Sequence, residues 1–205
     1  MQIIKQSAEL VWVTPGPEKI IERIGRVCYK SEDKITDDSY KKFIEMLKSR
    51  KHYAMLEHAS ASIHFITERG VTHEIVRHRL AAYAQESTRY CNYAKDKFGS
   101  EIKIHMPDDL NEMQRQRRIE LYKLIESLYM QEIKEGITPQ IARDSLPTCL
   151  KTEIVVTANL REWLHILSLR TAPAAQPKMR ELMNMAWVIL KQEAPTVFET
   201  IPEGV

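Results

Sequence analysis

The chain has 205 residues, of which 43% are hydrophobic and 28% charged, and its formal net charge is +2 at pH 7. This length and composition are typical of a soluble globular protein, and we expect one domain over residues 1–205 with its own buried core. The weak net charge argues against a general nucleic-acid-binding protein, and the absence of a signal-peptide pattern or a long apolar run predicts a cytoplasmic protein without a membrane partner.

The predicted elements of the N-terminal part begin with a strand or hairpin over residues 2–14, which stops at the breaker Pro15-Gly16-Pro17. A helix begins at Pro17 and reaches about residue 28, and a second helix covers about 37–50. Alternating apolar and polar residues then predict a half-buried strand over 61–67. A short helix is expected over about 71–78.

The C-terminal part is mainly helical. A long helix is predicted over 111–134, with Leu121, Leu124, Ile125, Leu128 and Tyr129 on one stripe. The elements expected after it are a helix over about 138–146, a β-branched strand over 152–157, and helices over 160–170 and 177–193. Few strands and many helices, without strict alternation, predict an α+β domain with an antiparallel or mixed sheet packed against several helices.

Residues 77–90 lack a clear period and hold the densest group of polar side chains. Arg77, His78 and Arg79 are adjacent, and adjacent residues of a helix do not share a face, so two guanidinium groups are expected to be accessible. Guanidinium groups bind phosphate through paired hydrogen bonds, and Ser87 offers a further donor. The alternative is a solvated basic helix end, which composition alone favours.

Polar residues at the ends of other elements strengthen the case for an anion site, because rigid scaffolds present functional groups there. They are Arg143, Asn159, Arg161 and Arg170. A metal site is not predicted, since the histidines near residues 58–73 lack any ligand spacing such as HExxH. The three cysteines, at 28, 91 and 149, form no CxxC pair, which argues against a disulfide framework.

The pattern Arg77-His78-Arg79, seven residues, then Ser87 resembles the signature of the flavin-dependent thymidylate synthases. Arg89 and Tyr90 extend the match. Further matching segments are His52 with Glu57-His58, Arg143 with Leu146-Pro147, Asn159 with Arg161, and Leu169-Arg170, in the family's order from about residue 20 to 190. The chain differs from many members of the family at Cys28, Ala54, Ala84 and Ala174.

The resemblance implies an α+β homotetramer whose active sites are each shared between subunits. It further implies FAD as cofactor, NADPH as reductant and methylenetetrahydrofolate as carbon donor, so that deoxyuridylate (dUMP) becomes thymidylate. Two alternatives remain: a related flavin-dependent enzyme that methylates or hydroxymethylates another pyrimidine nucleotide, and a nucleic-acid-binding module that uses residues 77–89. The small net charge disfavours the second alternative.

The resemblance also implies roles for individual residues. Those expected to bind FAD are His52, Ala54, Arg77, His78, Arg79, Gln85, Asn159, Leu160, Arg161 and His165. Those expected to bind dUMP are Glu74, Ile75, Val76, Arg77, Gln85, Glu86, Ser87, Thr88, Arg89, Arg143 and Arg170. Arg170 is the expected catalytic residue, because a permanent positive charge can stabilise negative charge that develops on the uracil ring, without attack by a cysteine.

Overall fold

The computed structural model describes residues 1–201, which divide into two compact units. The first unit comprises residues 1–7, 66–75 and 84–154. The second comprises residues 8–65, 76–83 and the described part of 155–205. Each unit is therefore assembled from segments that are far apart in the sequence, and the chain passes between the units several times.

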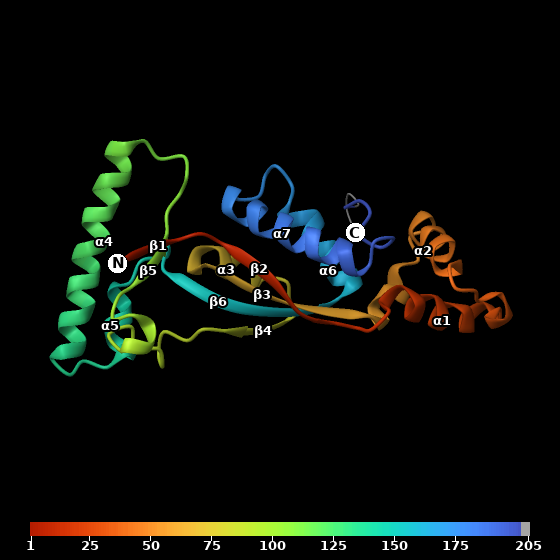
Figure 1. The fold of residues 1–205 in the computed structure, drawn as a ribbon, viewed down its shortest axis with the longest axis horizontal. Helices are drawn as coiled ribbons and strands as arrows, with labels where there is room; N and C mark the ends of the chain where they lie inside the picture. The colour runs from red at the N-terminus through yellow and green to blue at the C-terminus, as the bar shows by residue number, and fades with distance from the viewer. Residues whose placement is uncertain (202–205) are drawn as a thin grey trace. The chain divides into compact units, whose positions relative to one another are not determined.

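Four of the strands pair into one sheet (Figure 1). Residues at both ends of its central strands show that these strands are antiparallel: the Leu160 amide donates to the Ala59 carbonyl, and the Arg69 amide donates to the Leu150 carbonyl. The strand order is β2 (Ser7–Val13), β3 (Ser60–Glu68), β6 (Lys151–Asn159) and β4 (Ala82–Gln85). The strands predicted over 61–67 and 152–157 are confirmed as β3 and β6, within a mixed fold of helices and antiparallel sheet.

The prediction of one strand or a hairpin over residues 2–14 is wrong. Residues 2–4 form β1 (Gln2–Ile4), which pairs in parallel with β5 (Lys103–His105), whereas β2 belongs to the four-stranded sheet. The partner of β1 lies about a hundred residues away, and a local pattern does not reveal such a pairing. Strands β4 and β5 are also new, because four and three residues are too few to show a period.

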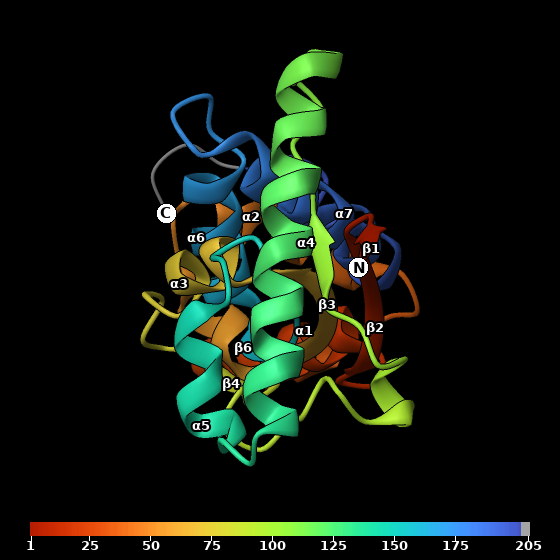
Figure 2. The same cartoon turned by 90° about the vertical axis from the view of Figure 1, so that its left-hand side faces the viewer.

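The first unit is built around α4 (Glu112–Lys134), with α5 (Pro139–Ala142) beside it (Figure 2). Asn111 caps α4 in a capping box, because its side chain accepts from the Gln114 amide while the Gln114 side chain accepts from the Asn111 amide. The unit also contains α3 (Arg69–Ile75) and a hydrophobic core. The buried residues of this core include Tyr93, Ile102, Ile104, Met106, Tyr122, Tyr129 and Leu150.

Only part of the predicted apolar stripe of α4 faces the core of its own chain. Leu121, Leu124 and Leu128 are 52%, 70% and 47% exposed, whereas Tyr122 and Tyr129 are buried. The hydroxyl of Tyr129 accepts a hydrogen bond from the backbone amide of Tyr93 at 3.3 Å, so the buried aromatic side also has a polar anchor. The helical period is correct, and of the predicted stripe Tyr129 lies in the core and Ile125 packs against it, whereas the three leucines lie outside.

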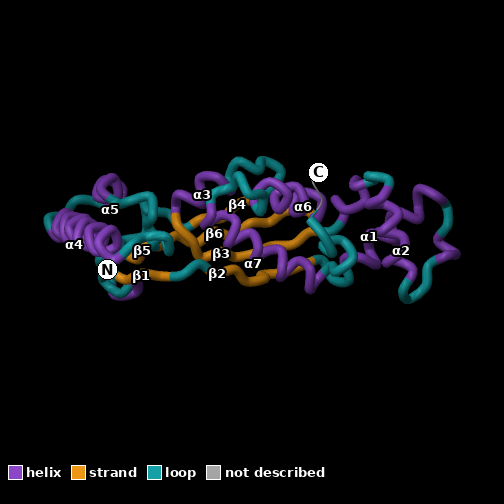
Figure 3. The backbone as a smooth tube through the Cα atoms, turned by 90° about the horizontal axis from the view of Figure 1, so that it is seen from above, coloured by secondary structure: helices purple, strands orange, loops and turns teal. Residues whose placement is uncertain are grey.

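The second unit contains four of the longer helices (Figures 1 and 3), two of which begin with proline in the first turn. Helix α6 packs on β3 through Trp163, whose indole donates to the Ala61 carbonyl at 3.0 Å and whose ring lies 6.4 Å from that of Phe65. The helices are α1 (Pro17–Tyr29), α2 (Ser39–Ser49), α6 (Leu160–Arg170) and α7 (Pro177–Glu193). Within residues 1–201, no helix is both long enough and apolar enough to cross a membrane.

Candidate functional site

The junction between β6 and α6 places several of the predicted site residues. Asn159 ends β6 and caps α6, because its side-chain oxygen accepts from the Glu162 amide at 2.8 Å. The helix starts without a loop, so its first turns present Arg161, Glu162 and His165 at fixed positions. Arg170 stands in the last turn of the same helix.

The segment that carries Arg77, His78 and Arg79 forms a turn rather than the end of a helix. The sequence predicts a helix over 71–78, but α3 ends at Ile75, and two donors then fold the chain around one carbonyl. The Ala81 amide and the Tyr83 hydroxyl both donate to the His78 carbonyl, at 3.2 and 2.6 Å. This turn buries His78 and leaves both neighbouring arginines exposed.

These segments enclose a pocket of about 1010 Å³ in the second unit. Its volume is at the upper end of the range for small-molecule and cofactor sites. Seven predicted site residues line it: Arg77, His78, Arg79, Asn159, Arg161, His165 and Arg170. Four further residues line it that were not predicted as site residues, although Glu57 and Leu169 lie in segments that match the family: Glu57, Leu80, Glu162 and Leu169. The position of Glu162 three residues after the cap and three before His165 on the same helix is the signal that could have identified it.

His78 and Arg170 form the central polar contact of the pocket. The Arg170 Nε donates to His78 Nε2 at 2.9 Å. Because a guanidinium group cannot accept a hydrogen bond, Nε2 of His78 must carry a lone pair. Burial, aided by the positive charge of Arg170 and by His165, lowers the pKa of His78 to about 4. The ring is therefore neutral near pH 7 and carries its proton on Nδ1.

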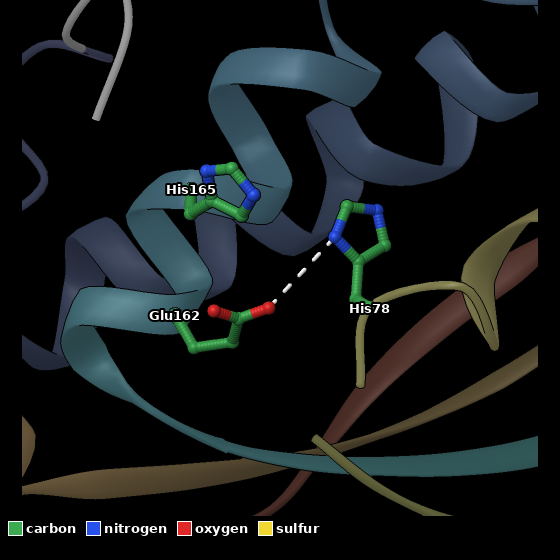
Figure 4. A group of neighbouring side chains, drawn as sticks. All are labelled: His78, Glu162 and His165. Atoms are coloured by element: carbon green, nitrogen blue, oxygen red, sulfur yellow. Dashed lines mark ion pairs between the residues drawn. The ribbon is translucent and has the colours of Figure 1, made fainter. Parts of the chain in front are cut away.

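That protonated nitrogen faces Glu162. His78 Nδ1 lies 3.8 Å from Glu162 Oε1, and both side chains are buried (Figure 4). Burial raises the pKa of Glu162, while His165 and Arg161 lower it. The His165 ring stands edge-on to that of His78, with centroids 5.8 Å apart. The two imidazoles and the carboxylate thus form one compact group that lines the pocket.

His78, Glu162 and His165 also have the composition of a metal site, since one ligand atom from each lies within 4.8 Å of the others. A tetrahedral zinc site needs its ligand atoms roughly 3.3 Å apart, as follows from Zn–N bonds of about 2.0 Å. The Arg170 guanidinium occupies one nitrogen of His78 and adds a positive charge beside the group. These features favour a hydrogen-bonded function over a cation, and the expectation of no metal site stays a prediction.

In the first unit, Gln85 and Glu86 are engaged in internal hydrogen bonds. The Gln85 amide donates to the hydroxyls of Thr72 and Thr152, at 2.8 and 3.2 Å. The Glu86 carboxylate accepts from the Tyr93 hydroxyl at 2.6 Å and from the Lys151 ammonium at 2.9 Å. Burial and this carboxylate together raise the pKa of Tyr93. The Glu86 side chain therefore has a structural role here.

The polar segment after Glu86 meets the residues around α5. Arg89 Nε donates to the Gln140 side chain at 3.0 Å, and Arg143 Nη1 donates to the Thr88 hydroxyl at 3.4 Å. The Ser87 hydroxyl accepts from the Arg89 amide at 3.3 Å. These contacts hold two guanidinium groups and two hydroxyls of the first unit near one another, as an anion site requires.

The remaining predicted residues lie elsewhere. His52 and Ala54 are exposed and do not line the pocket, although Glu57 of the following 3₁₀ turn (Tyr53–His58) pairs with Arg161. Leu160 and Ile75 belong to the buried core, so only their backbone could meet a ligand. Glu74 is partly buried and Val76 is exposed.

Comparisons with known proteins identify relatives over nearly the whole chain. A family model described as "Thymidylate synthase complementing protein" matches residues 9–196. A flavin-dependent thymidylate synthase from Geobacter sulfurreducens is 30% identical over 200 residues, covering 93% of this chain and 84% of the relative. One from Pyrococcus abyssi is 34% identical over 196 residues, covering 90% and 78%.

A solved structure shares the fold. The crystal structure of a UMP/dUMP methylase from Streptomyces cacaoi, bound with 5-Br dUMP, superposes with a TM-score of 0.85 over 98% of this chain and 100% of that chain. At 20% sequence identity, this likeness supports the architecture alone. The family match extends from β2 to the residues after α7, and with these relatives it shows that the chain belongs to the thymidylate synthase complementing protein family.

Proposed function

We propose that this protein is a flavin-dependent thymidylate synthase, which converts dUMP to thymidylate without a cysteine nucleophile. The observation that carries the proposal is the arginine-rich pocket in which a neutral His78 holds Arg170. Family membership supplies the reaction class, and the pocket supplies a permanent positive charge of fixed orientation. The proposed conversion of dUMP to thymidylate needs both.

Arg170 is the residue assigned to activation of the uracil ring. Carbon 5 of uracil must become nucleophilic to accept a one-carbon unit, and negative charge then develops on the ring. A guanidinium group that stays protonated stabilises this charge, and its fixed position reduces the reorganisation needed during the reaction. Removing one preorganised donor of this kind typically costs about 10²–10³ in turnover.

The cysteines fit poorly with the alternative of covalent catalysis. A nucleophilic cysteine needs a lowered pKa and access to the substrate. Burial instead raises the pKa of Cys91, Cys149 is buried, and Cys28 is exposed on α1. The pocket lining includes no cysteine among the described residues.

Ser87, Arg89 and Arg143 are assigned to the phosphate of dUMP. Each guanidinium has five N–H donors, and the observed contacts with Gln140 and Thr88 use only part of them. Paired hydrogen bonds to phosphate oxygens are the strongest contacts that such groups make. Thr88 and the backbone near Gln85 and Glu86 complete this proposed contact set.

The pocket also has the donor set that FAD needs. Arg77, Arg79 and Arg161 line the pocket and provide positive charge for a diphosphate, and His78 and His165 line it beside them. Bound in reduced form, the flavin would supply the hydride that completes the new methyl group. NADPH as its reductant and methylenetetrahydrofolate as carbon donor belong to the same proposal.

The assembly proposed for the enzyme is a homotetramer with active sites shared between subunits. The exposed leucines of α4 support it, because a contiguous apolar surface on a helix is a common site of association. Leu80, at the rim of the pocket, is also largely exposed. A neighbouring copy would cover such side chains.

The test is to incubate the purified protein with FAD, NADPH, methylenetetrahydrofolate and dUMP, and to separate the nucleotides. We expect flavin absorbance and thymidylate, and turnover at least about 100-fold lower for Arg170→Ala, with unchanged thermal stability. Arg23→Ala, at an exposed position of α1, is the matched control. Cys28→Ser, Cys91→Ser and Cys149→Ser should each stay active. A protein that binds no FAD would contradict the proposal, and a hydroxymethylated product would assign it to the related enzymes.

A further inference from the structure

We propose that Glu162 is a positioning residue that acts through His78 to hold Arg170 in its productive orientation. This inference rests on the proposed function, because it assigns a purpose to the orientation of Arg170. We call Glu162, His78 and Arg170 the positioning triad. The carboxylate faces one ring nitrogen of His78 and the guanidinium contacts the other.

The geometry of the imidazole carries the inference. Arg170 Nε can only donate, so the contact at 2.9 Å requires His78 to accept through Nε2. A neutral ring that accepts through Nε2 must have its proton on Nδ1. Glu162 Oε1 lies 3.8 Å from Nδ1, where its negative charge favours this tautomer (Figure 4). Without the carboxylate, the tautomer with the proton on Nε2 would become more accessible and would repel the Arg170 donor.

Further contacts hold His78 and the backbone of Glu162 in place. The Tyr83 hydroxyl holds the backbone carbonyl of His78 at 2.6 Å, and the His165 ring packs edge-on against the imidazole. The Asn159 cap holds the backbone of Glu162. Burial and the Glu162 charge raise the pKa of Tyr83 to about 12, so its hydroxyl remains a donor. Catalytic groups with such support keep a precise geometry.

Glu162 also has a simpler structural role, and an experiment must separate this role from the proposed positioning of Arg170. A carboxylate in the first turn favours a helix N-terminus, and Glu162 is the acidic residue in the first turn of α6. Exposed residues can supply this effect, however, as Glu112 does in α4. Glu162 is instead buried, at a cost in free energy that the helix end alone does not require. The position opposite His78 Nδ1 explains the burial.

The first experiment measures kcat and KM for dUMP, together with FAD content and Tm, in Glu162→Gln and Glu162→Leu. Glutamine keeps an acceptor without the charge, and leucine removes both. We expect kcat to fall about 10-fold and about 100-fold respectively, with KM within about threefold and FAD content unchanged. Glu112→Gln is the control for loss of a first-turn charge and should keep wild-type kcat. Wild-type kcat in Glu162→Leu would overturn the inference.

A double-mutant cycle tests whether Glu162 acts through Arg170. In an Arg170→Lys background the planar contact with His78 is already lost, so adding Glu162→Gln should lower kcat less than about twofold. An equal further loss in both backgrounds would show independent roles and would overturn the triad. A wild-type enzyme that makes no thymidylate overturns the proposed function itself, a result that is distinct from an active enzyme insensitive to Glu162.

A third measurement can be made on the wild-type protein, so it does not depend on whether a Glu162 variant folds. Nitrogen-15 spectra of the imidazoles, with His78→Gln used for assignment, should show His78 protonated on Nδ1 and unprotonated on Nε2 near pH 7. In Glu162→Leu the signals should move towards the other tautomer. A wild-type ring protonated on Nε2 would overturn the inference, whatever the kinetic results.

Discussion

At the scale of single residues, the neutral state of His78 determines its contact with Arg170 in the pocket and contributes to the stability of the protein. An imidazolium at this position would lose the lone pair that accepts from Arg170 and would add a second positive charge beside it. Burial and Arg170 therefore favour the neutral ring. Glu162 and His165 also face the ring, and the Tyr83 hydroxyl contacts the His78 carbonyl.

This electrostatic arrangement predicts a contribution of His78 to the pH dependence of stability. The pKa of His78 is about 4 in the folded protein, against 6.5 as its ordinary value, so the unfolded chain binds more protons between these limits. The free energy of unfolding therefore falls as the pH drops from about 7 towards 4. His78→Gln lacks this term, so the difference in stability between wild type and His78→Gln should decrease over the same range.

Urea denaturation of both proteins at pH 7, 6 and 5 would measure this difference. His73→Gln, which replaces an exposed histidine of α3, controls for the loss of an imidazole elsewhere. A difference between wild type and His78→Gln that stays constant from pH 7 to 5 would contradict the assignment of a neutral, buried His78.

At the scale of elements, the packing of α1 on α2 depends on a glycine. A β-carbon built on Gly25 would lie 2.5 Å from the ring of Phe43, which is a clash. Phe43 is buried, and the Arg26 guanidinium lies 4.8 Å from its ring centre, so the ring has little room to move. Gly25 therefore sets how closely the two helices approach.

Gly25→Ala should lower the free energy of unfolding by about 1–3 kcal/mol, because the added methyl group overpacks the contact. Helix propensity alone predicts the opposite sign, since alanine normally stabilises a helix interior by about 0.5–1 kcal/mol relative to glycine. Chemical denaturation decides between the two. In a Phe43→Leu background, which opens space at the contact, Gly25→Ala should become much less harmful. A stabilising effect in the wild-type background would contradict the packing account.

The elements differ in how far the sequence predicts them. Long helices such as α4, α6 and α7 follow from apolar periodicity, and their predicted bounds agree with the structure within a few residues. Strands β1 and β5 could not be predicted, because each is three residues long and their pairing spans about a hundred residues. A local sequence pattern therefore predicts long helices but not the pairing of short strands that are far apart in the sequence.

The residues of the site also differ in how far the sequence predicts them. The resemblance identifies Arg77, His78, Arg79, Arg161 and Arg170, and the structure brings these five into one pocket. It does not predict that the Glu86 carboxylate binds Tyr93 and Lys151, because such a choice depends on tertiary neighbours. The position of Glu162 on its helix could be predicted, but its contact with His78 could not, for the same reason. Its partner His78 is 84 positions earlier in the chain, and only folding brings them together.

At the scale of the whole molecule, the proposed tetramer bears directly on the site. The residues assigned to dUMP fall in both compact units of the chain. A tetramer with shared active sites would allow one nucleotide to take contacts from different copies. The apolar surface of α4 is the part of the described chain that points most clearly to such an assembly, because Leu121, Leu124 and Leu128 are spaced for one helix face.

If this face joins subunits, placing charge on it should dissociate the assembly. The double variant Leu124→Glu with Leu128→Glu would place two carboxylates where a partner packs, and burying unpaired charge costs several kcal/mol. Analytical ultracentrifugation should give the wild type a mass near four times the 23.9 kDa of one chain, and the double variant a smaller species. Lys123→Glu, at an exposed polar position of the same helix, should keep the wild-type mass.

If catalysis needs residues from two copies, the rate of thymidylate formation must fall in the double variant as the assembly dissociates. A fully active monomer would show that each chain holds a complete site, and that the exposed leucines serve some other contact.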